Sequence, residues 1–157
     1  MSGTRAVIEA AYPLCSALIS LVLAQALKPF IYWFKEHKWI PLLAFSSGGL
    51  PSSHSAAVAG LTLAVGFQEN FSSTLFAVSV IFSVIVVYDA ANVRYYAGKN
   101  IEITQQLIKD LEELSEIHLD DPIYLEKVKN VLGHKWSEVI SGIVLGLGIA
   151  ILLKVFY

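Results

Sequence analysis

The sequence predicts an all-α integral membrane protein: a helical bundle of about four transmembrane helices with a short amphipathic helical insert on the cytoplasmic side. Three observations predict this fold class. The 157 residues are 55% hydrophobic, and their mean hydropathy of +0.62 is high for a soluble domain of this length. Uncharged stretches of about the length that crosses a bilayer recur along the chain. Much of the charge is gathered in one segment, so residues 1–157 are expected to form a single membrane domain with a water-soluble insert.

Charge-free stretches locate the spans. Residues 10–27 carry no charged side chain, and neither do residues 70–88; both are close to the roughly 20 residues that cross a bilayer. Residues 55–68 and 139–153 are shorter uncharged runs, and the second is followed by Lys154 and two aromatic residues, which are typical of a membrane interface. We therefore expect transmembrane helices near residues 10–30, 53–68, 71–94 and 137–156.

The segment between the third and fourth spans belongs in water. Residues 95–135 hold eight of the 13 acidic and five of the 11 basic residues, a balance that gives no basis for nucleic-acid binding. An aspartate before Pro122 predicts a short helix that ends near Val131. Before it, apolar residues at helical spacing predict an amphipathic helix whose stripe packs on neighbouring segments, with a lid or a homodimer contact as the alternatives. The stripe consists of Ile103, Leu107, Ile108, Leu111 and Leu114.

The positions of Lys and Arg predict the orientation. With four spans, the loop after the first span and the insert after the third lie on one side of the membrane, and nine of the 11 basic residues fall there. Only Arg5 and Lys154 fall on the other side. Cytoplasmic loops carry the excess of Lys and Arg in most membrane proteins. Both loops are therefore expected in the cytoplasm, at a plasma or inner membrane, and both termini outside.

Polar and ionisable residues gather at the span ends on that same side. Antiparallel helices bring these ends together, and ionisable side chains at membrane depth usually face a bundle interior because their burial in lipid is costly. The convergence predicts a functional site. Its members, in chain order, are Lys28, Ser52, Ser53, His54, Asp89, Arg94, His134 and Glu138.

Part of this set is suited to hold an anion. The cations of the set are Lys28 and Arg94, and Lys35 is a supporting candidate because it lies beyond the end of the first span. The start of the second span offers serine hydroxyls and backbone N–H groups. An arginine fork and a helix N-terminus are both typical phosphate ligands. Asp89 is interpreted as a structural partner for one of the cations rather than as a catalytic group.

Two histidines and a glutamate supply the chemistry. His54 and His134 can serve as a general acid and a nucleophile. Glu138 lies four residues after His134, one helical turn along the same face, where it could hold one ring nitrogen protonated and leave the other free to attack. This combination predicts hydrolysis of a phosphate ester with neither a metal nor another cofactor.

Three sequence blocks resemble one known family. They are PSSHS, YDAANVR and GHKWSEV, which begin at Pro51, Tyr88 and Gly133. PSSHS resembles the PSGH motif of the type 2 phosphatidic acid phosphatase superfamily, which includes lipid phosphate phosphatases and vanadium haloperoxidases. The three blocks in this order, each at a span end, resemble its divergent small membrane branch. The resemblance runs from Gln25 to Gly142 and implies a membrane-bound phosphatase.

The resemblance also implies phosphate-binding roles, residue by residue. Lys28 matches the lysine of the first motif, although Lys35 and Glu36 stand where that motif has Arg-Pro. Ser52 matches the phosphate-binding serine of the second motif, and Ser53 replaces its glycine. In the third motif, Arg94 matches the phosphate-binding arginine.

The catalytic roles follow from the same resemblance. His134 matches the nucleophile, His54 the general acid and Glu138 the orienting carboxylate. The reaction would pass through a phosphohistidine on His134, with His54 protonating the leaving alkoxide before water releases the phosphate. In this chain 39 residues, 95–133, stand between the arginine and the nucleophile where the family has five.

Other functions remain open from the sequence. A non-enzymatic membrane protein could bind a lipid phosphate with Lys28 and Arg94 alone, and a metal-dependent hydrolase could use the histidines and carboxylates as ligands. A phosphotransferase would share the enzyme interpretation. Among substrates, phosphatidylglycerophosphate is favoured because its synthesis leaves a terminal phosphate on the inner leaflet. The alternatives are phosphatidic acid and polyprenyl phosphates or diphosphates.

Overall fold

The structure, a computed structural model, describes residues 2–46, 48–115 and 133–156, and these residues form helices and loops without a strand. Its helices are α1 (Ser2–Glu36), η1 (Pro41–Phe45), α2 (Ser53–Glu69), α3 (Thr74–Tyr88), η2 (Asp89–Val93), α4 (Arg94–Ser115) and α6 (Trp136–Lys154). η1 is a short 3₁₀ helix and η2 is a single π-helical turn.

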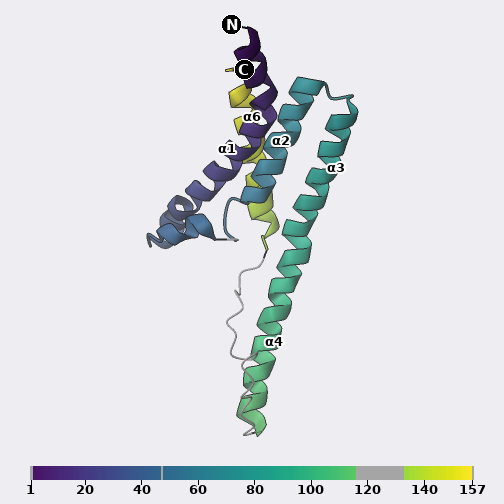
Figure 1. Ribbon diagram of the computed structural model, residues 1–157. Coiled ribbons are helices and arrows are strands. Elements are labelled where there is room, and N and C mark those ends of the chain that lie inside the picture. The colour runs from purple at the N-terminus through teal and green to yellow at the C-terminus, as the bar shows by residue number, and fades with distance from the viewer. Residues whose placement is uncertain (1, 47, 116–132, 157) are drawn as a thin grey trace.

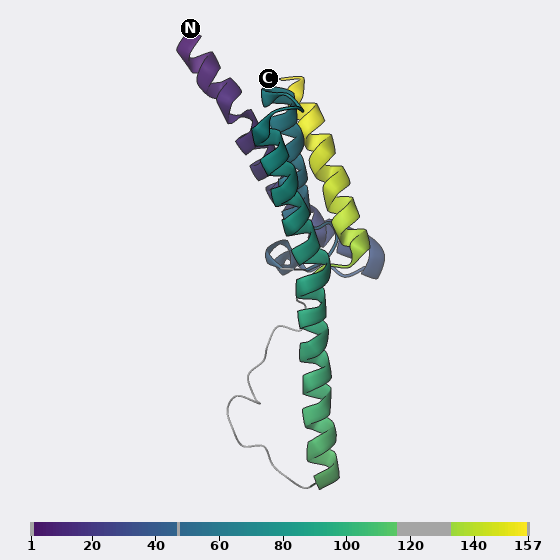
Figure 2. The same ribbon diagram turned by 90° about the vertical axis from the view of Figure 1, so that its right-hand side faces the viewer.

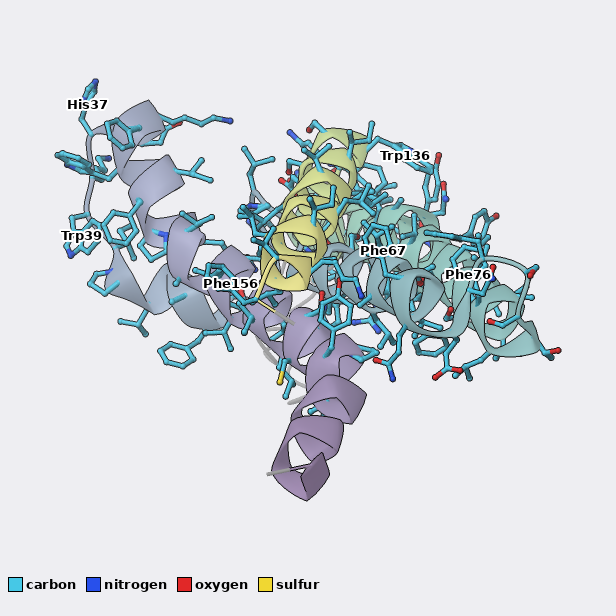
Figure 3. All side chains as sticks on the ribbon, turned by 90° about the horizontal axis from the view of Figure 1, so that it is seen from above. His37, Trp39, Phe67, Phe76, Trp136 and Phe156 are labelled. Carbon is cyan, nitrogen blue, oxygen red and sulfur yellow. The ribbon has the colours of Figure 1, made fainter. Side chains whose placement is uncertain are left out.

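The helices α1, α2, α3 and α6 form a bundle in which α1 and α3 run in one direction and α2 and α6 in the other (Figure 1). Both ends of the chain lie at one end of this bundle, and the start of α2, the α3–α4 junction and the start of α6 lie at the other (Figure 1). α4 continues the line of α3 and projects well beyond the bundle (Figures 1 and 2). The far end of α1 leans away, so His37 and Trp39 lie on the opposite side of the molecule from Phe76 (Figure 3).

Small residues allow the central helices to approach closely. α2 contacts α1, α3 and α6. A Cβ on Gly142 would lie 3.1 Å from the carbonyl carbon of Ser52, and a Cβ on Gly146 would lie 2.9 Å from the backbone nitrogen of Gly60. Glycines at such positions let two helix backbones pack directly on each other, as is common between membrane helices. This packing fixes the start of α2 against the start of α6.

The outer surface of the bundle is apolar, and this establishes an integral membrane protein. Three stretches are long and apolar enough to span a bilayer: Ala11–Glu36, Thr74–Leu111 and Trp136–Lys154. α2 has 17 residues, which is at the short end of the range for a span, and packs inside the bundle. On α3 large apolar side chains face outward, Ile81 being 61% exposed. The predicted fold class, an all-α membrane bundle, is confirmed.

Two element boundaries differ from the sequence-based expectation. α1 extends to Glu36 rather than ending near residue 30, because Lys28 is buried within the helix instead of marking its end. The third span does not stop at residue 94 before a separate amphipathic helix: α3, η2 and α4 follow without a break, since no proline interrupts residues 74–115. The second predicted insert helix, near Pro122, lies outside the described residues.

The predicted apolar stripe of the insert belongs to α4. Two of its members are largely exposed, Ile103 at 64% and Leu107 at 56%. These two side chains do not pack on the bundle, because α4 projects away from the other helices (Figure 2). The neighbouring part of the insert, residues 116–132, lies outside the described residues, so the packing expected there stays a prediction.

Candidate active site

His134 is the most constrained ionisable residue of the site. Its side chain is 2% exposed, and its Nδ1 lies 2.8 Å from Oε2 of Glu138. An ionised carboxylate only accepts hydrogen bonds, so this contact keeps the proton on Nδ1 and leaves a lone pair on Nε2. Nε2 is buried and has no hydrogen-bond partner among the described residues.

The spacing predicts that His134 and Glu138 lie on one face of a helix, but in the structure only Glu138 lies within a helix. α6 begins at Trp136, after His134, and Lys135 is its N-cap residue. The backbone N–H of His134 donates instead to the carbonyl of Ala90 at 3.0 Å. The imidazole is thus held between α6, through Glu138, and the π-helical turn at the end of α3.

His134 lines a cavity together with three other predicted site residues. The cavity has a volume of about 250 Å³ and is lined by His54, Asp89, Arg94 and His134 along with apolar residues of α3. His54 comes from the first turn of α2 and is exposed. The structure therefore gathers both histidines, the arginine and an aspartate from three different helix ends around one space.

Arg94 and Asp89 form an ion pair at the rim of this cavity. Nε of Arg94 donates to Oδ2 of Asp89 at 2.6 Å, with the two side chains 50% and 37% exposed. Because Asp89 engages Nε, the two terminal nitrogens of the guanidinium remain able to bind an anion. Asp89 is thus paired with a cation, as its interpretation from the sequence as a structural partner suggested.

The two predicted serines have a structural role at the start of α2. Ser52 is the N-cap residue, and its Oγ accepts hydrogen bonds from the Ser55 backbone N–H at 3.4 Å and from the Ser55 hydroxyl at 2.9 Å. The Ser52 backbone N–H donates to the Glu138 carbonyl at 2.9 Å. Ser52 and Ser53 are both buried and do not line the cavity of His134. They fix the helix end that presents His54.

Lys28 and Lys35 line a second cavity. It has a volume of about 180 Å³, and Glu138 and the loop at Gly48 and Gly49 complete its wall. Lys28 is buried, and its Nζ donates to the carbonyl of Ser46 at 2.8 Å. Glu138 lines this cavity and His134 lines the other, so the two cavities lie on either side of the His134–Glu138 pair. The predicted single cradle is therefore divided between two spaces.

An apolar groove lies between α2, α3 and α6 and shares no lining residue with the first cavity. It encloses about 450 Å³, and its walls include Ala59, Val84, Ile143 and Trp136. In the view along the bundle axis, Trp136 lies on the side of α6 that faces α3 (Figure 3). Two hydroxyls in the wall are mutually satisfied: Oγ1 of Thr62 lies 2.6 Å from the hydroxyl of Ser83, which donates in turn to a backbone carbonyl. The groove thus presents hydrocarbon to whatever enters it.

Several contacts of the site have no signal in the sequence. Ala90 and Ser46 hold His134 and Lys28 through backbone carbonyls, which every residue type carries. The π-helical turn is also not predicted by any pattern in the sequence. Across the described residues, no three His, Cys, Asp or Glu side chains are grouped so that they could hold a metal ion.

Comparison with known proteins supports the resemblance of the three sequence blocks. A model of the Divergent PAP2 family matches residues 10–149. The chain is also 36% identical over 151 residues to the uncharacterized membrane protein YuiD of Bacillus subtilis, an alignment that covers 93% of this chain and 96% of YuiD. No solved structure matches. The family match spans the two histidines, Arg94 and Glu138, and the chain belongs to the Divergent PAP2 family.

Proposed function

We propose that this protein is a membrane lipid-phosphate phosphatase that hydrolyses a phosphomonoester through a phosphohistidine on His134. The observation that carries the proposal is the state of that imidazole: Glu138 holds Nδ1, and Nε2 has no partner within the described chain although its ring lines a cavity shared with His54 and Arg94. A buried nitrogen held in one tautomer without a partner is costly for folding and useful for nucleophilic attack.

The reaction proceeds in two balanced steps. The Nε2 lone pair attacks phosphorus while Arg94 binds the non-bridging oxygens; the bond from phosphorus to the leaving oxygen breaks, and His54 transfers its proton to the alkoxide. His54 then removes a proton from water, whose oxygen attacks the phosphohistidine. Inorganic phosphate leaves and His134 returns to its starting state. An alcohol in place of water would make the same site a phosphotransferase.

The apolar groove supports a lipid as the carrier of the phosphate. Its wall on α3 runs from Tyr88, the residue before Asp89 in the chain, to Phe76, and its wall on α6 includes Trp136, two residues after His134. Between Phe76 and Tyr88 a helix rises about 18 Å at about 1.5 Å per residue, a little more than half of a hydrocarbon core about 30 Å thick. A lipid chain in the groove would remain in its own leaflet while its headgroup reached the cavity.

The second cavity favours a substrate with two anionic groups. With the reacting phosphate next to Arg94, a further phosphate on the same headgroup would face Lys28 and Lys35 across the His134–Glu138 pair. Phosphatidylglycerophosphate has such a phosphodiester and phosphatidic acid does not. A polyprenyl diphosphate also has two phosphates, but its terminal phosphate is held by an anhydride bond rather than as a phosphomonoester, so phosphatidylglycerophosphate is the favoured substrate. The distribution of basic residues favours a cytoplasmic position for this end of the bundle, the side on which such a headgroup is made.

Phosphate release by the purified protein in detergent tests the proposal against a panel of phosphatidylglycerophosphate, phosphatidic acid and polyprenyl phosphates and diphosphates. We expect release from phosphatidylglycerophosphate at the highest kcat/KM, no effect of a chelator, and inhibition by vanadate. His134→Ala should abolish turnover and still bind the lipid phosphate, because Arg94 remains. His37→Asn is the control histidine variant and should retain activity, because His37 is exposed and lines neither cavity.

Two results would redirect the assignment. If the folded protein binds a lipid phosphate and releases none from any member of the panel, it is a carrier or scaffold. If a chelator removes activity and a divalent cation restores it, the reaction depends on a metal.

A further inference from the structure

The two ends of the long insert meet directly at the active site. The chain leaves the site at Arg94 and returns to it at Gly133. A Cβ on Gly133 would lie 2.6 Å from the Cα of Tyr95 and would also overlap the carbonyl carbon of Arg94. Gly133 has a φ of +94°, a conformation that residues with a side chain rarely adopt. Only glycine therefore allows the chain to lie against the start of α4 at this point.

The π-helical turn provides the second half of the contact. In a regular α-helix the carbonyl of Ala90 would accept the N–H of Arg94, four residues on. Here the Arg94 N–H donates to the carbonyl of Asp89 instead. The Ala90 carbonyl is thereby released from that bond, and it accepts the backbone N–H of His134 at 3.0 Å. The widened turn thus fixes the residue proposed as the nucleophile.

We infer that Gly133 and the carbonyl of Ala90 form a clasp that positions the His134 imidazole against Arg94. The inference rests on the proposed phosphatase function. Ala90 lines the cavity with an apolar methyl group and Gly133 has no side chain, so neither offers a reactive group; they are positioning residues that act through His134. The clasp also explains how 39 residues can separate Arg94 from His134 in the sequence while both line one cavity: the insert begins and ends at the same point in space.

The expected effect of disturbing the clasp follows from the geometry. A Cβ at Gly133 needs at least about 3.4 Å from the nearest backbone atoms, so the chain at this position must move by about 1 Å. The loop moves rather than α4, because Arg94 and Tyr95 lie within a continuous helix. A misplacement of about 1 Å can cost on the order of 100-fold in rate. Substrate binding by Arg94 remains.

The first test measures kcat and KM for Gly133→Ala in the full-length protein, on the best substrate of the panel. Gly148→Ala is the matched control, since a Cβ at Gly148 has no neighbour within 4 Å. We expect kcat to fall about 100-fold in Gly133→Ala with KM within threefold, and both values to remain unchanged in Gly148→Ala. An unchanged kcat in Gly133→Ala would overturn the clasp.

The second test does not depend on activity. Diethyl pyrocarbonate modifies accessible neutral imidazoles, and peptide mass spectrometry reports the rate at each histidine. His134 should react slowly in the wild-type protein because it is 2% exposed, and at least fivefold faster in Gly133→Ala, with His54 as the internal reference. A fall in kcat without faster modification of His134 would contradict positioning through that residue.

Deletion of Asn92 tests the other half of the clasp and serves if Gly133→Ala does not fold. Removing one residue from a π-helical turn restores the α-helical register; the Arg94 N–H then keeps the Asp89 carbonyl, and the Tyr95 N–H, now four residues after Ala90, occupies the Ala90 carbonyl. His134 should again be modified at least fivefold faster; an unchanged rate would overturn the role of Ala90. If these rates change as expected but the wild-type protein releases no phosphate from any lipid, the clasp stands as a structural feature and the phosphatase function fails.

Discussion

The contact between Glu138 and His134 allows a quantitative prediction. Oε2 of Glu138 lies 2.8 Å from Nδ1 of an imidazole that is 2% exposed, so water does not compete for this hydrogen bond. Glu138→Gln keeps the shape of the side chain and removes its charge. A hydrogen bond to a charged group contributes about 1.5 to 3 kcal/mol, which corresponds to a loss of roughly 10- to 150-fold in kcat at about 1.36 kcal/mol per tenfold.

The amide can lower the rate further. If its NH₂ group turns toward Nδ1, it stabilises the tautomer that carries the proton on Nε2, and the same type of substitution in serine protease triads costs about 10⁴-fold. We therefore expect kcat of Glu138→Gln to fall by between about 10- and 10⁴-fold, with little change in KM for phosphatidic acid, because Glu138 does not line the cavity of the reacting phosphate and this substrate has no second phosphate to place beside Lys28 and Lys35.

Steady-state phosphate release in detergent measures both constants. Ser141→Ala is the matched control: its hydroxyl donates to the backbone carbonyl of Glu138 at 2.9 Å and leaves the carboxylate untouched. Its kcat should stay within twofold of wild type. A Glu138→Gln protein with wild-type kcat would refute the orienting role and reduce Glu138 to a charge at the N-terminus of α6.

Two further predictions concern the arginine and the orientation. Arg94→Ala should lower kcat/KM at least tenfold through loss of a charge-assisted contact worth about 1.5 to 3 kcal/mol. Arg94→Lys should restore little of this activity, because a single ammonium group lacks the planar fork that can pair with Asp89 and still bind two phosphate oxygens. Full activity of Arg94→Lys in the same assay would show that the fork geometry is irrelevant. In a Cys15→Ser background, a cysteine at Lys109 should react with an impermeant maleimide only from the cytoplasmic side and a cysteine at Arg5 only from outside; labelling of position 109 from outside would reverse the orientation.

The candidate site shows how far side-chain chemistry alone reaches. The ionisable residues at the ends of the apolar spans are His54, Asp89, Arg94 and His134. Because neighbouring spans alternate in direction, these span ends all lie at one end of the bundle. Their convergence is predictable because membrane burial of an unshared charge is so costly. Their roles in catalysis stay predictions until they are tested.

The division of the cations could not be predicted in this way. Spacing places Lys28 at the right depth, but whether it faces His134 or the neighbouring cavity depends on the loop that supplies the Ser46 carbonyl. Ser52 likewise matches a phosphate ligand by motif, while in the structure its hydroxyl caps α2. Both outcomes depend on which backbone groups lie nearby, and backbone groups are the same at every position of a sequence.

The sequence by itself determined that the chain is an all-α membrane protein, since 55% hydrophobic residues in bilayer-length runs have no soluble alternative. It also predicted that His54, Asp89, Arg94 and His134 converge, and the structure places these four around one cavity. Only the tertiary structure decided that α3 continues into α4 through a π-helical turn, that this turn releases the Ala90 carbonyl for His134, and that Gly133 closes the insert onto Arg94. The physical reason is that these contacts join backbone atoms of residues far apart in the chain, and a periodic pattern of side chains reports only on neighbours within a few turns.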